Sequence, residues 1–209
     1  MNMRLWGAAV LFGLAVFAGA DAMAFPRVSD PTQRQAALPK GGFLTDRDFT
    51  PAHLGFRNFC DRYAEQCSSD GKGTTVDLDA DKWQDLVEVN DLVNDRVEPD
   101  NYGTDYENWS LEATRGHCNE YAIQKRKELV DRGWPIAALS LAVAHTRYDE
   151  GNVFHLVLTV RTDRGDFVLD NLRRKVLPVT KTGYGFMMRQ STIHPRLWVR
   201  TGGTRMNDV

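Results

Sequence analysis

The sequence has no excess of positive charge: its 209 residues carry 26 Lys and Arg against 28 Asp and Glu, a formal net charge of -2. Without a basic field, nucleic-acid binding is not expected. The chain also lacks an internal repeat and any zinc-ligand spacing of Cys and His, so no metal site is predicted. Its 42% hydrophobic and 26% charged residues are typical of one globular domain with a sizeable core.

The N-terminal apolar run is too short for a comfortable transmembrane helix, which needs about 20 residues. This run, residues 7–20, follows a short segment with one positive charge, Arg4, and precedes small residues spaced as Ala22-Met23-Ala24. That pattern predicts a secretory signal peptide at residues 1–24. Cleavage is expected after Ala24, with Ala20 and Ala22 as other sites. An uncleaved membrane anchor is the alternative.

Cysteine is scarce, and export makes the three cysteines Cys60, Cys67 and Cys118 informative. In an oxidising compartment a close pair tends to form a disulfide. On one continuous helix Cys60 and Cys67 would lie about 10 Å apart along the axis, whereas a disulfide needs Cα atoms within about 7 Å. A bridge therefore requires the helix to end before Cys67, which the residues at 68–71 favour. Cys118 is then left as a reactive thiol or as the link to a partner chain.

The order of the predicted elements, helices first and an antiparallel sheet afterwards, indicates an α+β fold. Residues 25–47 are expected to form an irregular N-terminal arm, ahead of one domain at 48–209. Helices are predicted at 50–63, with Thr50 as N-cap and Pro51 in the first turn, at 79–97 and at 116–131. Strands are predicted at 137–147, 153–161, 167–170, 184–190 and 197–200, with a turn at 162–166.

Cys118 lies just inside the predicted start of the third helix. The unpaired N–H groups and the dipole of a helix N-terminus favour the thiolate, which is the nucleophilic form. The same N–H groups can support an oxyanion. Gly116, just before the cysteine, lets a substrate backbone approach closely. A buried, inert cysteine is the alternative.

His155 and Asp170 are the candidate partners of this thiol. A histidine within an apolar strand needs a hydrogen-bond partner. If the hairpin turns on Asp163-Arg164, Asp170 is a diagonal neighbour of His155 on the same face; a turn on Arg164-Gly165 keeps the face but separates them further. Either register permits a carboxylate to orient the imidazole, as a triad requires. The alternative is a satisfied core histidine and a polar strand end.

Weaker candidates surround these three residues. His145, which ends the preceding predicted strand, is the rival base. Asn90 and Asn94 lie on the second helix, where an amide either satisfies a buried backbone group or faces the site as an oxyanion donor. Trp109 is a candidate wall of the substrate cleft, although an aromatic residue beside a helix start commonly belongs to the core.

At this point the residues resemble those of the bacterial transglutaminase-like cysteine proteinases. Residues 116–125, followed by Leu129 and Gly133, resemble the active-site helix of that family. Residues 154–158 resemble the family's histidine strand, and residues 168–172 resemble its aspartate motif. Residues 184–186 and 190–191, ahead of Trp198, resemble its C-terminal signature. The resemblance covers residues 43–199 and also fits the Cys60 and Cys67 pair. It implies a papain-like fold in which Cys118, His155 and Asp170 form a Cys-His-Asp triad.

The resemblance also implies a biological setting. LapG-type members of the family are periplasmic, cut large surface adhesins, need calcium and are sequestered by an inner-membrane receptor for cyclic di-GMP. Their nucleophile is usually flanked by acidic residues that help bind calcium, whereas here the flanks are His117 and Asn119, with Glu120 alone remaining. Neutral ligands weaken a site for a hard cation, so this chain is expected to be a relative with its own substrate.

Three hypotheses follow. The first is a monomeric, periplasmic thiol peptidase or amidase that works through a thioester acyl-enzyme on a surface or periplasmic protein, with water or an amine as acyl acceptor. The second is a catalytically silent binding module with the same fold. The third is a dimer linked through Cys118.

Overall fold

The computed structural model describes residues 38–100, 107–148 and 151–202. The predicted signal peptide at 1–24 and most of the predicted arm at 25–47 lie outside these residues. Within them, no helix combines the length and the apolarity that crossing a bilayer requires.

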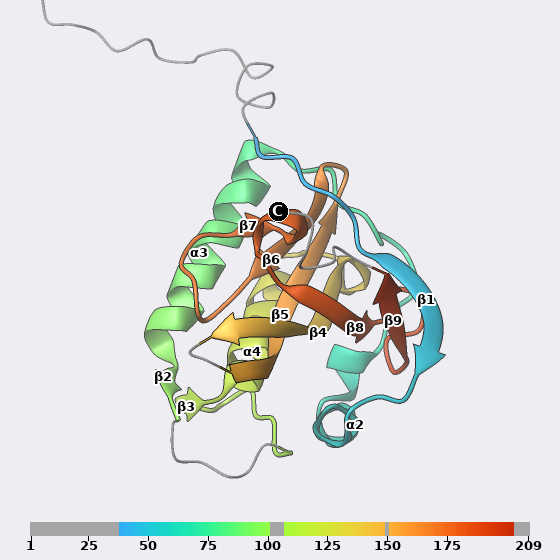
Figure 1. Ribbon diagram of the computed structural model, residues 1–209, viewed down its shortest axis with the longest axis vertical. Coiled ribbons are helices and arrows are strands. Elements are labelled where there is room, and N and C mark those ends of the chain that lie inside the picture. The colour runs from blue at the N-terminus through green and yellow to red at the C-terminus, as the bar shows by residue number, and fades with distance from the viewer. Residues whose placement is uncertain (1–37, 101–106, 149–150, 203–209) are drawn as a thin grey trace, which may run out of the picture.

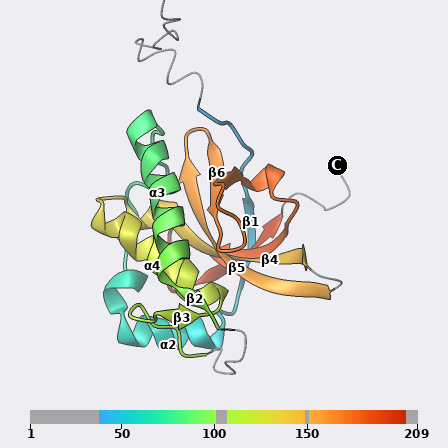
Figure 2. The same cartoon turned by 90° about the vertical axis from the view of Figure 1, so that its left-hand side faces the viewer.

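Three α-helices lie on one side of a large sheet (Figure 2). They are α2 (Leu54–Arg62), α3 (Ala80–Arg96) and α4 (Cys118–Asp131). Short 3₁₀ turns are η1 (Ala64–Cys67), η2 (Ile136–Ala138) and η3 (Val179–Lys181). The strands are β1 (Thr45–Thr50), β2 (Glu98–Pro99), β3 (Arg115–Gly116), β4 (Leu139–Tyr148), β5 (Gly151–Thr162), β6 (Gly165–Leu169), β7 (Leu177–Pro178), β8 (Gly185–Gln190) and β9 (Trp198–Gly202).

The main sheet has seven strands in the order β1-β9-β8-β4-β5-β6-β7, and all its neighbouring strands run antiparallel (Figure 1). Helices before an antiparallel sheet make this an α+β fold, which confirms the prediction. The small parallel pair of β2 and β3 precedes α4 directly. It therefore delivers the chain to the helix that begins with the cysteine.

The core lies between the helices and the sheet. Apolar side chains of α2, α3 and α4 meet those of β4, β5 and β6 there, and each fully buried one contributes about 1.5–3 kcal/mol. Examples are Phe56, Phe59, Leu86, Val93, Ile123, Leu129, Leu141 and Leu158. A second cluster covers the opposite face of the sheet and includes Ala144, Val157, Tyr184 and Phe186. The helix α4 is thus held tightly against β5.

The first helix starts later than predicted. Its N-cap is His53, whose Nδ1 accepts a hydrogen bond from the Gly55 N–H at 3.3 Å. The predicted N-cap, Thr50, instead ends β1 and pairs with Trp198 of β9. Because β1 begins at Thr45, the described end of the predicted arm is a strand rather than an irregular segment. Pairing with a distant strand outweighed the local capping signal.

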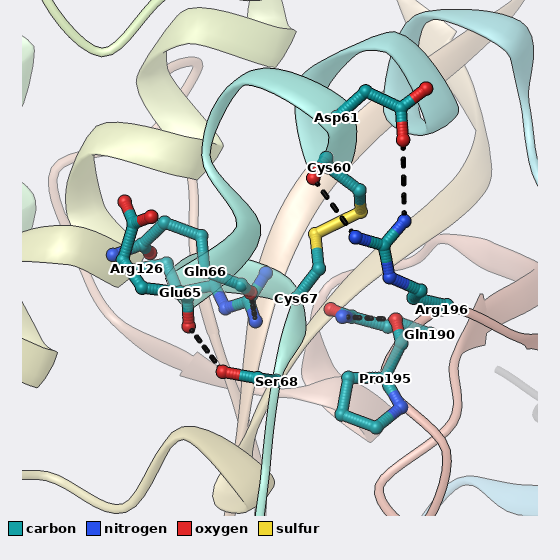
Figure 3. The surroundings of a disulfide bond; sticks show 10 residues. All are labelled: Cys60, Asp61, Glu65, Gln66, Cys67, Ser68, Arg126, Gln190, Pro195 and Arg196. Atoms are coloured by element: carbon teal, nitrogen blue, oxygen red, sulfur yellow. Dashed lines mark hydrogen bonds and ion pairs between the residues drawn. A yellow bond between two sulfur atoms is a disulfide. The ribbon is translucent and has the colours of Figure 1, made fainter.

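The predicted disulfide between Cys60 and Cys67 is present, with Cα atoms 5.5 Å apart (Figure 3). The helix α2 ends at Arg62, before the second cysteine, as a bridge requires. The bridge holds η1 against the core, where the carbonyl of Gln66 accepts a hydrogen bond from the fully buried Arg126 of α4. The disulfide therefore supports the packing of α4.

A buried ionic network ties the N-terminal segment to the sheet. Asp166 is fully buried and accepts hydrogen bonds from the Leu44 N–H at 2.8 Å and from two nitrogens of Arg161, each at 2.8 Å. Arg161 also donates to the Leu44 carbonyl at 2.7 Å. A further guanidinium, that of Arg189, is itself buried; it pairs with Asp46 of β1 at 2.6 Å and lies 3.8 Å from Asp166. One carboxylate thus holds two cations and the start of β1 together.

Candidate active site

Cys118 is the first residue of α4, and His117 is the N-cap. The Glu120 carboxylate accepts a hydrogen bond from the His117 N–H at 2.8 Å, which fixes the first turn as in a capping box. At Gly116 a Cβ atom would lie 2.6 Å from Cγ of Glu120, so this close approach needs glycine. The cysteine is therefore placed at the helix start as predicted. The helix itself begins two residues after Gly116, which belongs to β3.

The thiol of Cys118 is free and half-buried. Its Sγ lies 3.4 Å from the Leu156 N–H, which donates to it from β5. It is also a hydrogen-bond partner of the His155 side chain. The packing of α4 on β5 thus brings the nucleophile and the histidine together.

His155 and Asp170 form a buried pair, with Nε2 and Oδ1 2.7 Å apart. Thr162 pairs with Gly165, so the hairpin turns on Asp163-Arg164. This is the first of the two registers considered, and it makes Asp170 the diagonal neighbour of His155. The rival base, His145, instead packs against Phe154 with ring centroids 4.6 Å apart.

Three further groups fix Asp170. The Tyr184 hydroxyl donates to its Oδ2 at 2.5 Å, and the Leu172 N–H donates to its Oδ1 at 3.0 Å. Asn90 accepts from the Asp170 N–H at 2.9 Å. The sequence placed Tyr184 only in a C-terminal signature and did not reveal this contact, which joins the residue after β6 to the residue before β8. The carboxylate is held on both oxygens.

The charge states of the pair follow from its surroundings. Burial alone would lower the pKa of His155, but its hydrogen bonds and charge interactions with Asp170 and Cys118 outweigh burial and raise the pKa to about 9. Burial would raise the pKa of Asp170, but His155, Tyr184 and the Leu172 N–H together lower it. Burial and the bond to Asp170 raise the pKa of Tyr184, which keeps its proton. At neutral pH the pair is an imidazolium and a carboxylate.

The raised pKa of His155 makes stability depend on pH. Its ordinary value is 6.5 and its folded value about 9, so its contribution is complete below pH 6.5 and is lost as the pH rises through 9. We expect the difference in the free energy of unfolding between the wild type and His155→Gln to shrink by about 3 kcal/mol over this window. Urea unfolding of both proteins on either side of the window measures it; the same pH dependence in both would contradict the pairing.

Asn90 and Asn94 do not serve as oxyanion donors in this arrangement. The Asn90 amide donates to the carbonyls of Arg173 and Arg174, at 2.9 and 2.8 Å, and Asn94 donates to the Asp170 carbonyl at 3.0 Å. Both residues therefore have the alternative role, which is to satisfy buried backbone groups. Through these bonds α3 holds the loop that carries Asp170, which is a positioning role.

A cleft of about 1160 Å³ opens beside Cys118 and His155. Its walls are largely apolar and include Pro51, Trp109, Val143, Phe154, Leu156, Leu172, Met188 and Trp198. Trp109 lines this cleft as predicted and also packs on Phe56 and Phe59 of the core. The two roles considered for this residue are therefore compatible.

The residues beside the nucleophile do not fit a calcium site. Glu120 is buried, and its carboxylate caps the helix through the His117 N–H. Burial raises the pKa of this carboxyl, and the hydrogen bond from the His117 N–H offsets only part of that rise. No group of three or more His, Cys, Asp or Glu side chains suited to a metal ion occurs in the part of the chain that the structure describes.

A family model described as bacterial transglutaminase-like cysteine proteinase BTLCP matches residues 46–206. No curated protein matches. Among solved structures, calcium-bound Legionella pneumophila LapG is similar at 20% identity and a TM-score of 0.47, over 70% of this chain and 90% of that one. EGTA-treated LapG is similar at 20% identity and a TM-score of 0.48, over 76% and 95%.

Proposed function

Because this chain belongs to the bacterial transglutaminase-like cysteine proteinase family, we propose that it is an exported peptidase that cleaves a protein through a thioester on Cys118. The family is one of cysteine-type peptidases, so the substrate is a polypeptide. One observation carries the choice of residues: a free thiol at a helix start contacts His155, which Asp170 holds at 2.7 Å. This is the geometry of a nucleophile, its acid–base partner and an orienting carboxylate.

The first half of the reaction forms the acyl-enzyme. The Cys118 thiolate attacks the carbonyl carbon of the scissile peptide, and the π electrons of the carbonyl move to its oxygen. The Cys118 backbone N–H, at the start of α4, supports the resulting oxyanion. As the carbonyl reforms, the C–N bond breaks, and the His155 imidazolium gives its proton to the leaving amine. A thioester and a neutral imidazole remain.

The second half releases the acyl group. His155, now neutral, takes a proton from water while the water oxygen attacks the thioester carbonyl. Collapse of this intermediate breaks the C–S bond, which frees the acid and restores the thiolate beside the imidazolium. Asp170 keeps the ring oriented throughout, and Tyr184 keeps Asp170 in place. An amine in place of water would give acyl transfer instead.

The setting of this activity is proposed from the sequence. The signal-peptide pattern at 1–24 supports export to the periplasm, where the Cys60–Cys67 disulfide can form. Metal-independent catalysis is proposed because the residues flanking Cys118 do not fit a calcium site. A surface adhesin as substrate and an inner-membrane receptor as regulator stay predictions from the family resemblance.

Alkylation by iodoacetamide tests the proposed triad. At mildly acidic pH an ordinary thiol reacts slowly with iodoacetamide, and a thiol activated by a neighbouring histidine should react roughly 10²- to 10³-fold faster. We expect this rate for Cys118 and its loss in His155→Ala. Mass spectrometry of the labelled peptide measures it, with unfolded protein as the ordinary-thiol reference. Labelling at the reference rate in the folded protein would instead favour the silent binding module.

A further inference from the structure

Lys125 of α4 is fully buried, which is unusual for a lysine. Its Nζ has no hydrogen-bond partner among the residues that the structure describes. The amine lies 5.9 Å from the centroid of the Tyr121 ring, so the side chain points back toward the start of the helix, where Cys118 lies. A buried polar group without a hydrogen bond destabilises the fold. Packing alone therefore does not explain why a lysine occupies this position.

Contacts between α3 and α4, which lie side by side in Figure 2, locate this amine. Near the start of α4, the Tyr121 hydroxyl donates to the Val97 carbonyl, just after α3, at 2.6 Å. At the other end of α4, Arg132 pairs with Asp85, near the start of α3, at 2.8 Å. Lys125 follows Tyr121 by about one turn. It therefore faces the last two turns of α3.

These last two turns of α3 and the end of β6 surround the amine with acceptors. Asn94 donates to the Asp170 carbonyl, while its own Oδ1 is buried and accepts no hydrogen bond within the described ranges. Two carboxylates, those of Asp170 and Asp91, attract the ammonium form of Lys125. Asp170 also holds His155 of β5 at 2.7 Å. Two cationic groups, His155 and Lys125, thus share the carboxylate of Asp170.

The charge of Lys125 changes near neutral pH. Burial lowers the pKa of this amine to about 7, although Asp170 and Asp91 act against burial. Tyr121, on the same helix, keeps its proton in this range because burial raises its pKa. The pKa of Asp170 is lowered and that of His155 is raised, so both stay charged. Near pH 7, Lys125 is therefore the group whose charge beside Asp170 changes.

We propose that Lys125 is a positioning residue of the triad, whose buried ammonium group partly neutralises Asp170 and so favours the Cys118 thiolate. This inference rests on the proposed function, because it concerns the charge of the proposed nucleophile. Asp170 holds the imidazolium but also repels the thiolate, and a cation beside Asp170 reduces that repulsion. When Lys125 loses its proton, Asp170 acts on His155 with its full charge, and the hydrogen bond between them becomes stronger.

The pH profile of Cys118 alkylation tests this charge balance. Lys125→Met removes the amine and nearly keeps the length of the side chain. Below pH 7 we expect iodoacetamide to label Lys125→Met about three- to tenfold more slowly than the wild type. Above about pH 8 the two rates should be equal, because Lys125 is then neutral. Equal rates at every pH, or the same loss at every pH, would overturn the proposal.

Lys127→Met is the matched control for this experiment. Lys127 lies on the same helix, but it is partly exposed and pairs with Asp131. Its alkylation profile should match that of the wild type, because a screened surface charge has little effect on a buried site. A pH-dependent loss of the same size in Lys127→Met would overturn the assignment to Lys125.

The proton between His155 and Asp170 gives a second readout that needs no buried variant. Its ¹H NMR resonance lies far downfield in an imidazolium–carboxylate pair and moves further downfield as the bond strengthens. In the wild type we expect a downfield step centred near pH 7, where Lys125 loses its proton, although His155 keeps its own proton up to about pH 9. A wild-type resonance without this step would overturn the proposal.

Two surface variants assign the step to Lys125. Asp91→Asn removes one carboxylate that attracts the ammonium, so the step should move to lower pH by about 0.3 pH units. Asp95→Asn is the control, because Asp95 also pairs with Arg174 but is not among the charges that act on Lys125. A step that stays in place in Asp91→Asn would overturn the proposal, whereas fast iodoacetamide labelling of the same protein would leave the triad standing. Slow labelling of the wild type would overturn both.

Discussion

A Cys118→Ala variant is expected to lose peptidase activity completely. The variant lacks the atom that attacks the substrate, and loss of a triad nucleophile lowers turnover by about 10⁴- to 10⁶-fold. Its fold should persist, because Cys118 is half-buried at a helix start and takes no part in the Cys60–Cys67 disulfide. The helix cap through Glu120 and His117 remains in place.

The measurement is a comparison of exported proteins from cells that make the active chain and cells that make Cys118→Ala. A fragment that appears only with the active protein identifies the substrate and the cleavage site. The two proteins should unfold at the same urea concentration, which shows that only chemistry was removed. If the same fragments appeared with the variant, Cys118 would not be the nucleophile. Non-reducing electrophoresis tests the dimer hypothesis, which a single monomer band would remove.

Asp166→Ala is expected to destabilise the fold more than any substitution at the surface. The change leaves Arg161 without its carboxylate and the Leu44 N–H without an acceptor, while the buried Arg189 keeps its ion pair with Asp46. Removing one partner from a buried ionic network costs about 3–5 kcal/mol, because the remaining charge stays buried without compensation. The start of β1 should loosen with it.

Urea unfolding measures this loss, and Asp95→Ala is the matched control. Asp95 also pairs with an arginine, Arg174, but both side chains are largely exposed. Exposed pairs contribute little, so its unfolding midpoint should not change measurably. Equal midpoints for Asp166→Ala and the wild type would show that the N-terminal segment does not depend on this network.

Much of the candidate site was predicted because its signals are local. Gly116 and Cys118 are two residues apart at a helix start, and the signals of a helix start act between such near neighbours. The capping role of Glu120 was not predicted. The spacing of Cys60 and Cys67 set a condition on where a helix must end, and α2 meets it. Alternation along β5 and β6 put His155 and Asp170 on one face. These inferences needed only short-range geometry.

Other features depended on residues distant in the chain. The N-cap predicted at Thr50 was wrong because β1 pairs with β9, a partner that local propensity does not contain. The bond from the Asp170 N–H to Asn90 spans 80 residues, and its existence depends on how α3 packs. The contact of Tyr184 with Asp170 likewise joins segments that are separated along the chain, after β6 and before β8. From the sequence alone, several roles therefore stay open for an amide or hydroxyl side chain such as these.

The sequence by itself determined where the candidate residues lie: a cysteine at a helix start, a histidine in an apolar strand and an aspartate at the end of the next one. Each depends on periodicity and capping, which act within a few residues. Only the tertiary structure decided the hairpin register and the groups that hold Asp170. These depend on packing between elements, and the free energy of that packing comes from contacts between residues that are far apart in the sequence, which local patterns do not reveal.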